Sequence, residues 1–232
     1  MTGNALRLAA TILLVITACT STPENAVTTT DRSLSATRYL ALGDSYTIGE
    51  SVDPDERWPV HLARQLENSG FSFVDVQIVA RTGWTTSELA EGIDGADPSG
   101  PFDLVTLLIG VNNQFRGLDL GEYRAEFEAL VDRAIGFAGG DPSRVIVVSI
   151  PDWGVTPFAA GYPSDVIATE IDAFNSVGQD GAIRAGAHWV DITAVSRSDE
   201  PGLVAGDGLH PSGAQYQAWV NLILPVALQV LG

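Results

Sequence analysis

The sequence predicts an α/β fold, a three-layer sandwich in which a five-stranded parallel β-sheet is covered on both faces by helices. Short apolar runs of strand length alternate with segments of helical periodicity along most of the 232 residues. The apolar runs contain few polar residues, as expected for parallel strands that are buried on both faces. No internal repeat or second domain boundary interrupts the alternation. We therefore expect one domain over residues 38–232.

Five segments are predicted to form the strands, because each is a short apolar run that ends in a polar or glycine-bearing stretch. They are RYLALGDS (38–45), SFVDVQIVART (72–82), DLVTLLIGVNN (103–113), SRVIVVSIPDW (143–153) and HWVDIT (188–193).

Five segments between and after the strands are predicted to be helical. Residues 57–70 have helical periodicity, with Pro59 near the start and Gly70 just past the end. In residues 85–93, Thr85 and Glu88 have the spacing of a capping box. The other predicted helices lie at residues 121–140, within 166–185, and at 212–231, where Pro225 interrupts the pattern.

The charge balance excludes several classes of function. The chain has 12 basic residues, all arginine, against 29 acidic ones, which gives a net charge of −17. Such a charge repels nucleic acid and anionic lipid head groups. Without lysine, neither a P-loop phosphate site nor a pyridoxal phosphate Schiff base can form. The sequence predicts no cofactor.

The cysteine and histidine content argues against a metal site. One cysteine permits neither an internal disulfide nor a cysteine cluster. His61, His188 and His210 lie far apart, and none has the spacing of a metal-binding motif.

The N-terminal segment is predicted to be a signal peptide. Arg7 precedes an apolar run that is too short to span a bilayer, and the run ends in ITAC with the only cysteine, Cys19. This ending resembles the lipobox of bacterial lipoproteins, which implies cleavage after residues 1–18 and lipidation of Cys19. An ordinary signal peptide is the alternative. Residues 19–37 are predicted to be a flexible tether, and the domain is expected to be extracytoplasmic and anchored to a membrane.

Polar residues with complementary chemistry follow the predicted strands. Ser45 follows the first strand, Gly83 the second and Asn112 the third, while Asp207 and His210 lie after the fifth. In a parallel sheet the carboxyl ends of the strands meet along one edge, where active sites are found. The sequence therefore predicts that these five residues gather at that edge.

These residues suit nucleophilic catalysis. A serine hydroxyl needs a base, and His210 is the best candidate, with Asp207 three residues earlier to orient its ring. The amides of Ser45 and Gly83 and the side chain of Asn112 are candidate oxyanion donors. Taken singly, each residue also suits an ordinary turn or strand end, so the prediction depends on their occurring together and in order.

The segments GDSY (43–46), GVNN (110–113) and DGLHPSG (207–213), with a glycine after the second strand, resemble the four blocks of the SGNH (GDSL) hydrolase superfamily. The resemblance covers residues 39–213 and implies a flavodoxin-like fold that hydrolyses esters, thioesters and related acyl compounds. It also implies Ser45, His210 and Asp207 as the catalytic triad, and Ser45, Gly83 and Asn112 as the oxyanion hole. Asn113 departs from the family, which usually has aspartate there, and this puts the local loop structure in question.

Four aromatic residues close to these positions are candidates for the substrate pocket: Tyr46, Trp84, Phe115 and Trp153. Such rings suit an acyl pocket or a sugar platform. Packing of the loops onto the sheet is the alternative interpretation.

The leading hypothesis is a monomeric serine esterase that works through an acyl-enzyme. Its substrate is a small-molecule, lipid or carbohydrate ester, and esterase, lysophospholipase, deacetylase and thioesterase activities are not distinguished. A non-catalytic lipoprotein that binds a carbohydrate or acyl ligand is the alternative. A flavodoxin-like nucleotide binder is a third hypothesis, although no GxGxxG motif follows the first strand.

Overall fold

In the residues that it describes, the computed structural model has one five-stranded sheet, in which all neighbouring strands are parallel. The strand order is β2-β1-β3-β4-β5, which is the flavodoxin-like order. The strands are β1 (Thr37–Gly43), β2 (Phe73–Ala80), β3 (Leu104–Leu108), β4 (Val145–Val148) and β5 (His188–Val190). The predicted fold class and all five strands are thus confirmed.

The structure describes residues 1–3 and 36–232, and within the second range the side chains of residues 74 and 75 are not described. Most of the predicted signal peptide, Cys19 and most of the predicted tether lie outside the described residues. Within the two described ranges, no helix is long and apolar enough to cross a membrane.

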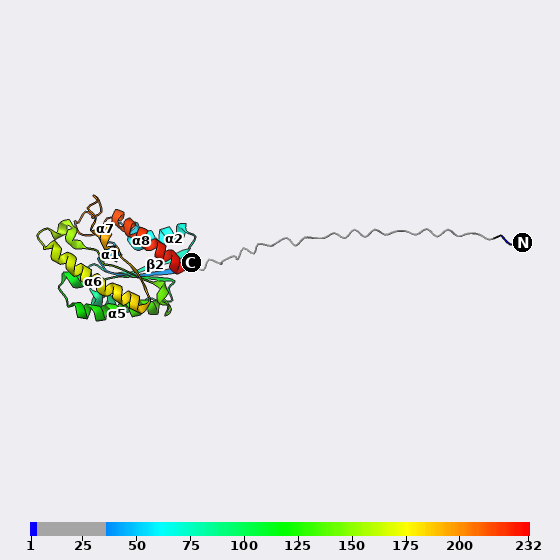
Figure 1. Cartoon of the computed structure of the whole chain (residues 1–232), viewed down its shortest axis with the longest axis horizontal. Helices are drawn as coiled ribbons and strands as arrows, with labels where there is room; N and C mark the ends of the chain where they lie inside the picture. Colours follow the sequence, from blue (N-terminus) through cyan, green and yellow to red (C-terminus); the bar gives the residue numbers. More distant parts are fainter. Residues whose placement is uncertain (4–35) are drawn as a thin grey trace. The chain divides into compact units, whose positions relative to one another are not determined.

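Long helices cover both faces of the sheet (Figure 1). Helices α2 (Trp58–Asn68) and α8 (Gly213–Leu231) pack together on one face, while α5 (Leu120–Phe137) and α6 (Ser164–Ala185) pack together on the other. Helix α3 (Thr86–Ala96) joins the second layer through contacts with α5. The three predicted layers are present.

Short helices occupy the connections between these elements. The α-helical turns are α1 (Ser45–Ile48), α4 (Val111–Phe115) and α7 (Thr193–Ser196), and the 3-10 turns are η1 (Pro54–Glu56), η2 (Pro142–Arg144), η3 (Trp153–Val155) and η4 (Pro157–Ala159).

Central burial explains the apolar strand sequences. Tyr39, Leu40, Ala41 and Leu42 are consecutive in β1, and all four are fully buried. Because successive side chains of a strand point to opposite faces, both faces of β1 must be covered. The same holds for β3, in which every residue is buried.

The third predicted strand is shorter than its apolar run. It ends at Leu108, and Gly110, with φ of 131°, turns the chain into α4. The Gln114 amide donates to the Gly110 carbonyl, which closes the first turn of this helix. Asn112 therefore lies on a short helix, where the sequence predicted a strand end. Helix α3 begins as predicted, with Thr85 and Glu88 forming the capping box.

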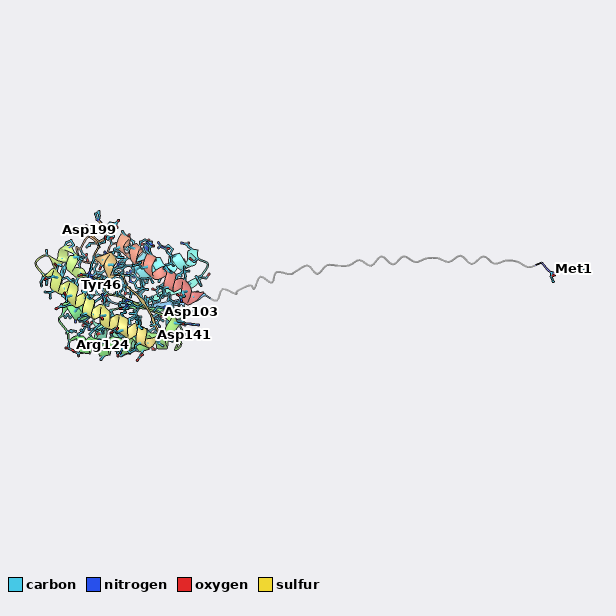
Figure 2. The ribbon with its side chains drawn as sticks, in the orientation of Figure 1. Met1, Tyr46, Asp103, Arg124, Asp141 and Asp199 are labelled. Carbon is cyan, nitrogen blue, oxygen red and sulfur yellow. The ribbon has the colours of Figure 1, made fainter. Side chains whose placement is uncertain are left out.

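The topology places a crevice beyond the carboxyl ends of the central strands. β1 pairs with β2 on one side and with β3 on the other, so the chain changes direction along the sheet at the β1/β3 pair. Ligands of open α/β sheets bind beside such a switch point. In Figure 2, Tyr46, which follows β1, lies to the left of Asp103 and Asp141, which precede β3 and β4.

Candidate active site

A cavity of about 140 Å³ lies at this switch point. Four of the five polar residues that the sequence singled out line it, namely Ser45, Gly83, Asn112 and His210. The fifth, Asp207, is hydrogen-bonded to His210. The structure therefore brings all five residues to one place.

Ser45 is the first residue of α1 and is 4% exposed. The chain turns sharply before it, at Gly43. A Cβ on Gly43 would lie 2.5 Å from the Leu108 carbonyl oxygen and 2.2 Å from the Thr47 hydroxyl, so only glycine fits. Asp44 then caps α1 by accepting a hydrogen bond from the Tyr46 amide at 3.0 Å. Gly43 and Asp44 shape the turn that presents Ser45.

Asp44 is fully buried beside the candidate oxyanion donor Asn112. Its Oδ2 accepts from Asn112 Nδ2 at 3.4 Å. Burial raises the pKa of Asp44 to about 7, although the bond from the Tyr46 amide opposes this rise. Below that pH the carboxyl group is mostly neutral and adds little negative charge near Asn112.

The raised pKa of Asp44 predicts a loss of stability with rising pH. Between its ordinary pKa of 3.8 and about 7, the folded state holds a proton that the unfolded state has released. The free energy of unfolding should therefore fall by roughly 3 kcal/mol more in the wild type than in Asp44→Asn from pH 4 to pH 7. Urea unfolding of both proteins across this range measures the difference. Parallel pH profiles would show that Asp44 titrates normally.

Asp207 and His210 form a close pair within one turn. His210 Nδ1 lies 2.6 Å from Asp207 Oδ2, while Asp207 Oδ1 accepts from the amides of Leu209 at 2.9 Å and His210 at 3.0 Å. Burial acts to raise the pKa of Asp207. Hydrogen bonds from Ser51, His210 and the two amides outweigh it and hold the pKa well below its usual range. The carboxylate is thus ionised at neutral pH and orients the imidazole.

The His210 ring is held by packing as well as by Asp207. The centroid of the Tyr46 ring lies 5.5 Å from that of His210, and the Trp219 ring of α8 lies 6.2 Å from Tyr46. Within the described part of the chain, no hydrogen bond joins the Ser45 hydroxyl to His210, although both line the cavity. Catalytic hydrogen bonds of this kind often tighten only when substrate binds.

The other two candidate oxyanion donors are fixed by α3 and α4. Gly83 has φ of 87°, a conformation that favours glycine. Arg116 Nη2 donates to its carbonyl at 2.6 Å and Nη1 pairs with Glu88 at 3.2 Å. Asn112 Nδ2 donates to the Trp84 carbonyl at 2.9 Å. Arg116 therefore holds the Gly83 loop, and Asn112 is tied to the same loop.

Asn113 has a structural role here. It is 1% exposed, its Oδ1 accepts from the Thr86 amide at 3.1 Å, and its Nδ2 donates to the Thr86 hydroxyl at 2.6 Å. Thr86 in turn donates to the Glu126 carboxylate. The side-chain amide thus joins α4 to the first turn of α3, and the loop remains ordered with asparagine at this position.

The aromatic candidates divide into two groups. Tyr46, Phe115 and Trp153 line the cavity. Trp84 does not. Its ring covers Gly92 on α3, where a Cβ would lie 2.1 Å from the indole.

Sequence reasoning missed Phe158, which lines the cavity, and Tyr162, which stacks on Phe158. Together Phe115, Trp153, Phe158 and Tyr162 form a contiguous group of rings, the aromatic wall.

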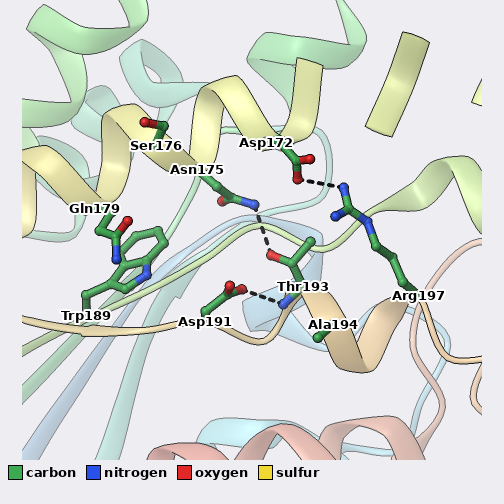
Figure 3. Close-up of a pocket in the computed structure, with 9 residues that line it drawn as sticks. All are labelled: Asp172, Asn175, Ser176, Gln179, Trp189, Asp191, Thr193, Ala194 and Arg197. Carbon is green, nitrogen blue, oxygen red and sulfur yellow. Dashed lines mark hydrogen bonds and ion pairs between the residues drawn. The ribbon is translucent and has the colours of Figure 1, made fainter. Parts of the chain in front are cut away.

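A second cavity, of about 430 Å³, lies between α6 and the connection from β5 to α7 (Figure 3). Its side chains bond to one another: Asn175 donates to the Thr193 hydroxyl at 3.0 Å, and Arg197 donates to Asp172 at 2.7 Å. Arg197 also pairs at 2.8 Å with the buried Asp152, the neighbour of Trp153. None of the predicted site residues lines this cavity. The hydrogen bonds of Asn175 and Arg197 hold the segment between β5 and α7 against α6.

Comparison with known proteins identifies the class. A family model described as the GDSL-like lipase/acylhydrolase family matches residues 41–218, so the chain belongs to that family and is a hydrolase that acts on esters. No curated protein matched the chain.

Solved structures share the fold. TesA is 18% identical with a TM-score of 0.67, and the match covers 84% of this chain and 99% of that one. The psychrotrophic esterase EstA from Pseudoalteromonas sp., inhibited by monoethylphosphonate, is 16% identical with a TM-score of 0.66, over 84% of this chain and 98% of that one. Axe2, an acetylxylan esterase from Geobacillus stearothermophilus, is 19% identical with a TM-score of 0.60, and the match covers 84% of this chain and 94% of that one.

Proposed function

We propose that the protein is a serine esterase in which Ser45, His210 and Asp207 form the catalytic triad. The observation that carries this proposal is the close Asp207–His210 pair on the same small cavity as Ser45. Family membership and the esterase fold support it.

The reaction would proceed in two halves. Ser45 Oγ attacks the ester carbonyl carbon as His210 Nε2 takes its proton, and the carbonyl π electrons move onto oxygen. The amides of Ser45 and Gly83 donate to this oxyanion. Asn112 Nδ2 also donates to it, by exchanging its long 3.4 Å bond to Asp44 for one to the oxyanion. The oxyanion collapses, the C–O bond to the alcohol breaks, and His210 protonates the leaving alkoxide. Water then attacks the acyl-enzyme by the same route and releases the acid.

The cavity favours an apolar acyl group of short to medium length. Its volume of about 140 Å³ approaches that of a roughly 150 Å³ protein cavity that binds benzene, so about six carbon atoms fit. Phe115 and Phe158 are 46% and 43% exposed, so the aromatic wall extends beyond the cavity and can contact a longer chain. The net charge of −17 disfavours anionic substrates.

A panel of p-nitrophenyl esters tests this assignment. We expect kcat/KM to be highest for acyl chains of about two to eight carbons. Phe158→Ala should lower kcat/KM for octanoate by about tenfold, because apolar contact is lost, and should leave acetate nearly unchanged. Leu222→Ala, which removes an exposed apolar side chain of α8, is the matched control.

The panel also separates the alternatives. An equal loss for acetate and octanoate would place Phe158 outside the acyl site. Tight binding of an ester or sugar without turnover of any substrate would support the non-catalytic hypothesis.

The N-terminal organisation is proposed from the sequence alone. Residues 1–18 would be removed, Cys19 would carry lipid, and residues 19–37 would tether the domain 38–232 outside the cytoplasm. Cys19→Ala is expected to abolish incorporation of a labelled fatty acid into the protein. Labelling of this variant at the wild-type level would contradict lipidation at Cys19.

A further inference from the structure

The loop that follows α1, residues 49–53, contains a residue in an unfavourable conformation. Ser51 has φ of 66°, and in the described ranges only Ser51 and Asp97 are non-glycine residues with positive φ. Ser51 is the third residue of a turn that the Val52 amide closes onto the Gly49 carbonyl at 3.4 Å. Positive φ at this position of a turn favours glycine or asparagine. The backbone conformation alone therefore disfavours serine at this position. The contacts of the Ser51 side chain explain why serine is found here.

The Ser51 hydroxyl bonds to the carboxylate that orients His210. Ser51 Oγ donates to Asp207 Oδ2 at 2.6 Å. The same oxygen lies 2.6 Å from His210 Nδ1. A hydrogen bond from a hydroxyl to an ionised carboxylate is among the stronger kinds. Asp207 Oδ2 is thus held between two partners, one of which comes from the loop beside the candidate nucleophile.

The neighbouring residue ties the same loop to the other half of the site. The Glu50 carboxylate accepts a hydrogen bond from the Thr82 hydroxyl, next to Gly83. The loop therefore contacts both the triad carboxylate and the segment that carries a candidate oxyanion donor. Both contacts come from the short stretch between Gly49 and Val52.

We propose that Ser51 is a positioning residue that fixes the carboxylate of Asp207 and thereby sets the orientation and basicity of His210. This inference rests on the proposed triad, and Ser51 itself touches no reacting atom. Without its hydroxyl, Oδ2 loses one hydrogen bond and is held only by His210, while Oδ1 keeps its bonds from the Leu209 and His210 amides. The negative charge on Oδ2, no longer shared with the Ser51 hydroxyl, then interacts only with the His210 ring. Catalysis slows, and the imidazolium form of His210 becomes more stable.

Two substitutions separate positioning from a purely structural role. Ser51→Gly removes the hydroxyl but relieves the positive φ, so the relieved backbone offsets part of the lost hydrogen bond and the protein should remain close to the wild type in stability. We expect kcat to fall about five- to tenfold with little change in KM, and the acidic limb of the kcat/KM profile to move to higher pH by a few tenths. Ser51→Thr keeps the hydroxyl but places a β-branched residue at positive φ. This variant should be less stable yet retain most of its kcat.

Asp97→Gly is the matched control, because it relieves the other positive-φ residue at the C-terminus of α3. It should leave kcat and the pH profile unchanged. If kcat follows stability, so that Ser51→Gly is fully active with an unchanged pH profile and Ser51→Thr is slow, the inference is wrong. Ser45→Ala in the same assay separates the role of Ser51 from the proposed catalytic triad. If Ser45→Ala remains active, the proposed function is wrong. If Ser45→Ala is inactive while Ser51→Gly keeps the wild-type kcat and pH profile, only the role of Ser51 is wrong.

Discussion

Ser45→Ala is expected to lower kcat/KM for p-nitrophenyl butyrate by at least about 10⁴-fold. Without the hydroxyl no acyl-enzyme forms, and only the oxyanion donors and the binding cavity remain to accelerate attack by water. The variant should fold normally, since the Ser45 hydroxyl makes no hydrogen bond to another described residue and α1 is capped by Asp44. Initial rates over a range of substrate concentrations, together with thermal unfolding, measure both properties.

Ser69→Ala is the matched control for this variant, because Ser69 is an exposed serine at the end of α2. Its activity should equal that of the wild type. If Ser45→Ala kept more than about a tenth of the wild-type activity, a different group would have to be the nucleophile.

Asp207→Asn is expected to lower kcat by about 10⁴-fold at neutral pH. The substituted side chain would be neutral, and its amide nitrogen would take the place of Oδ2 beside His210 Nδ1, 2.6 Å away in the wild type. The amide would then donate to Nδ1, which forces the ring proton onto Nε2. In that tautomer Nε2 cannot accept the proton of Ser45. The amide oxygen of the new side chain can still accept from the amides of Leu209 and His210, so the turn should persist.

Asp199→Asn, in the exposed segment between α7 and α8, controls for the loss of one negative charge. Its kcat should remain at the wild-type value. A similar kcat for Asp207→Asn and the wild type would remove Asp207 from the mechanism.

Much of the fold could be predicted because its signals are local. The apolar runs of β1 and β3 are buried on both faces, and the Thr85–Glu88 pair caps α3 as its spacing indicated. The meeting of Ser45 with His210 was also predictable. Parallel strands expose their carboxyl ends at one edge, so residues far apart in sequence come together there.

The remaining parts of the site depend on contacts that carry no local signal. Ser51 contacts Asp207 because it is the third residue of a turn and has positive φ. A serine in the sequence does not predict that conformation. Arginine is a common surface residue, so its type gave no sign that the Arg116 side chain donates a hydrogen bond to the Gly83 carbonyl. Phe158 lies in the second of two successive 3-10 turns that follow β4, and these turns place it at the cavity. Such short turns have no hydrophobic periodicity by which the sequence could predict them.

The most direct test of the central claim is to locate the adduct of a fluorophosphonate probe. Attack by the nucleophile on phosphorus expels fluoride and leaves a stable phosphonate ester on the enzyme. Trypsin should release residues 39–57 as one peptide that contains both Ser45 and Ser51, so fragment-ion spectra must distinguish the two serines. The proposed mechanism predicts one phosphonate per chain, on Ser45, and no adduct in Ser45→Ala. An adduct on another residue, or labelling that persists in Ser45→Ala, would contradict it.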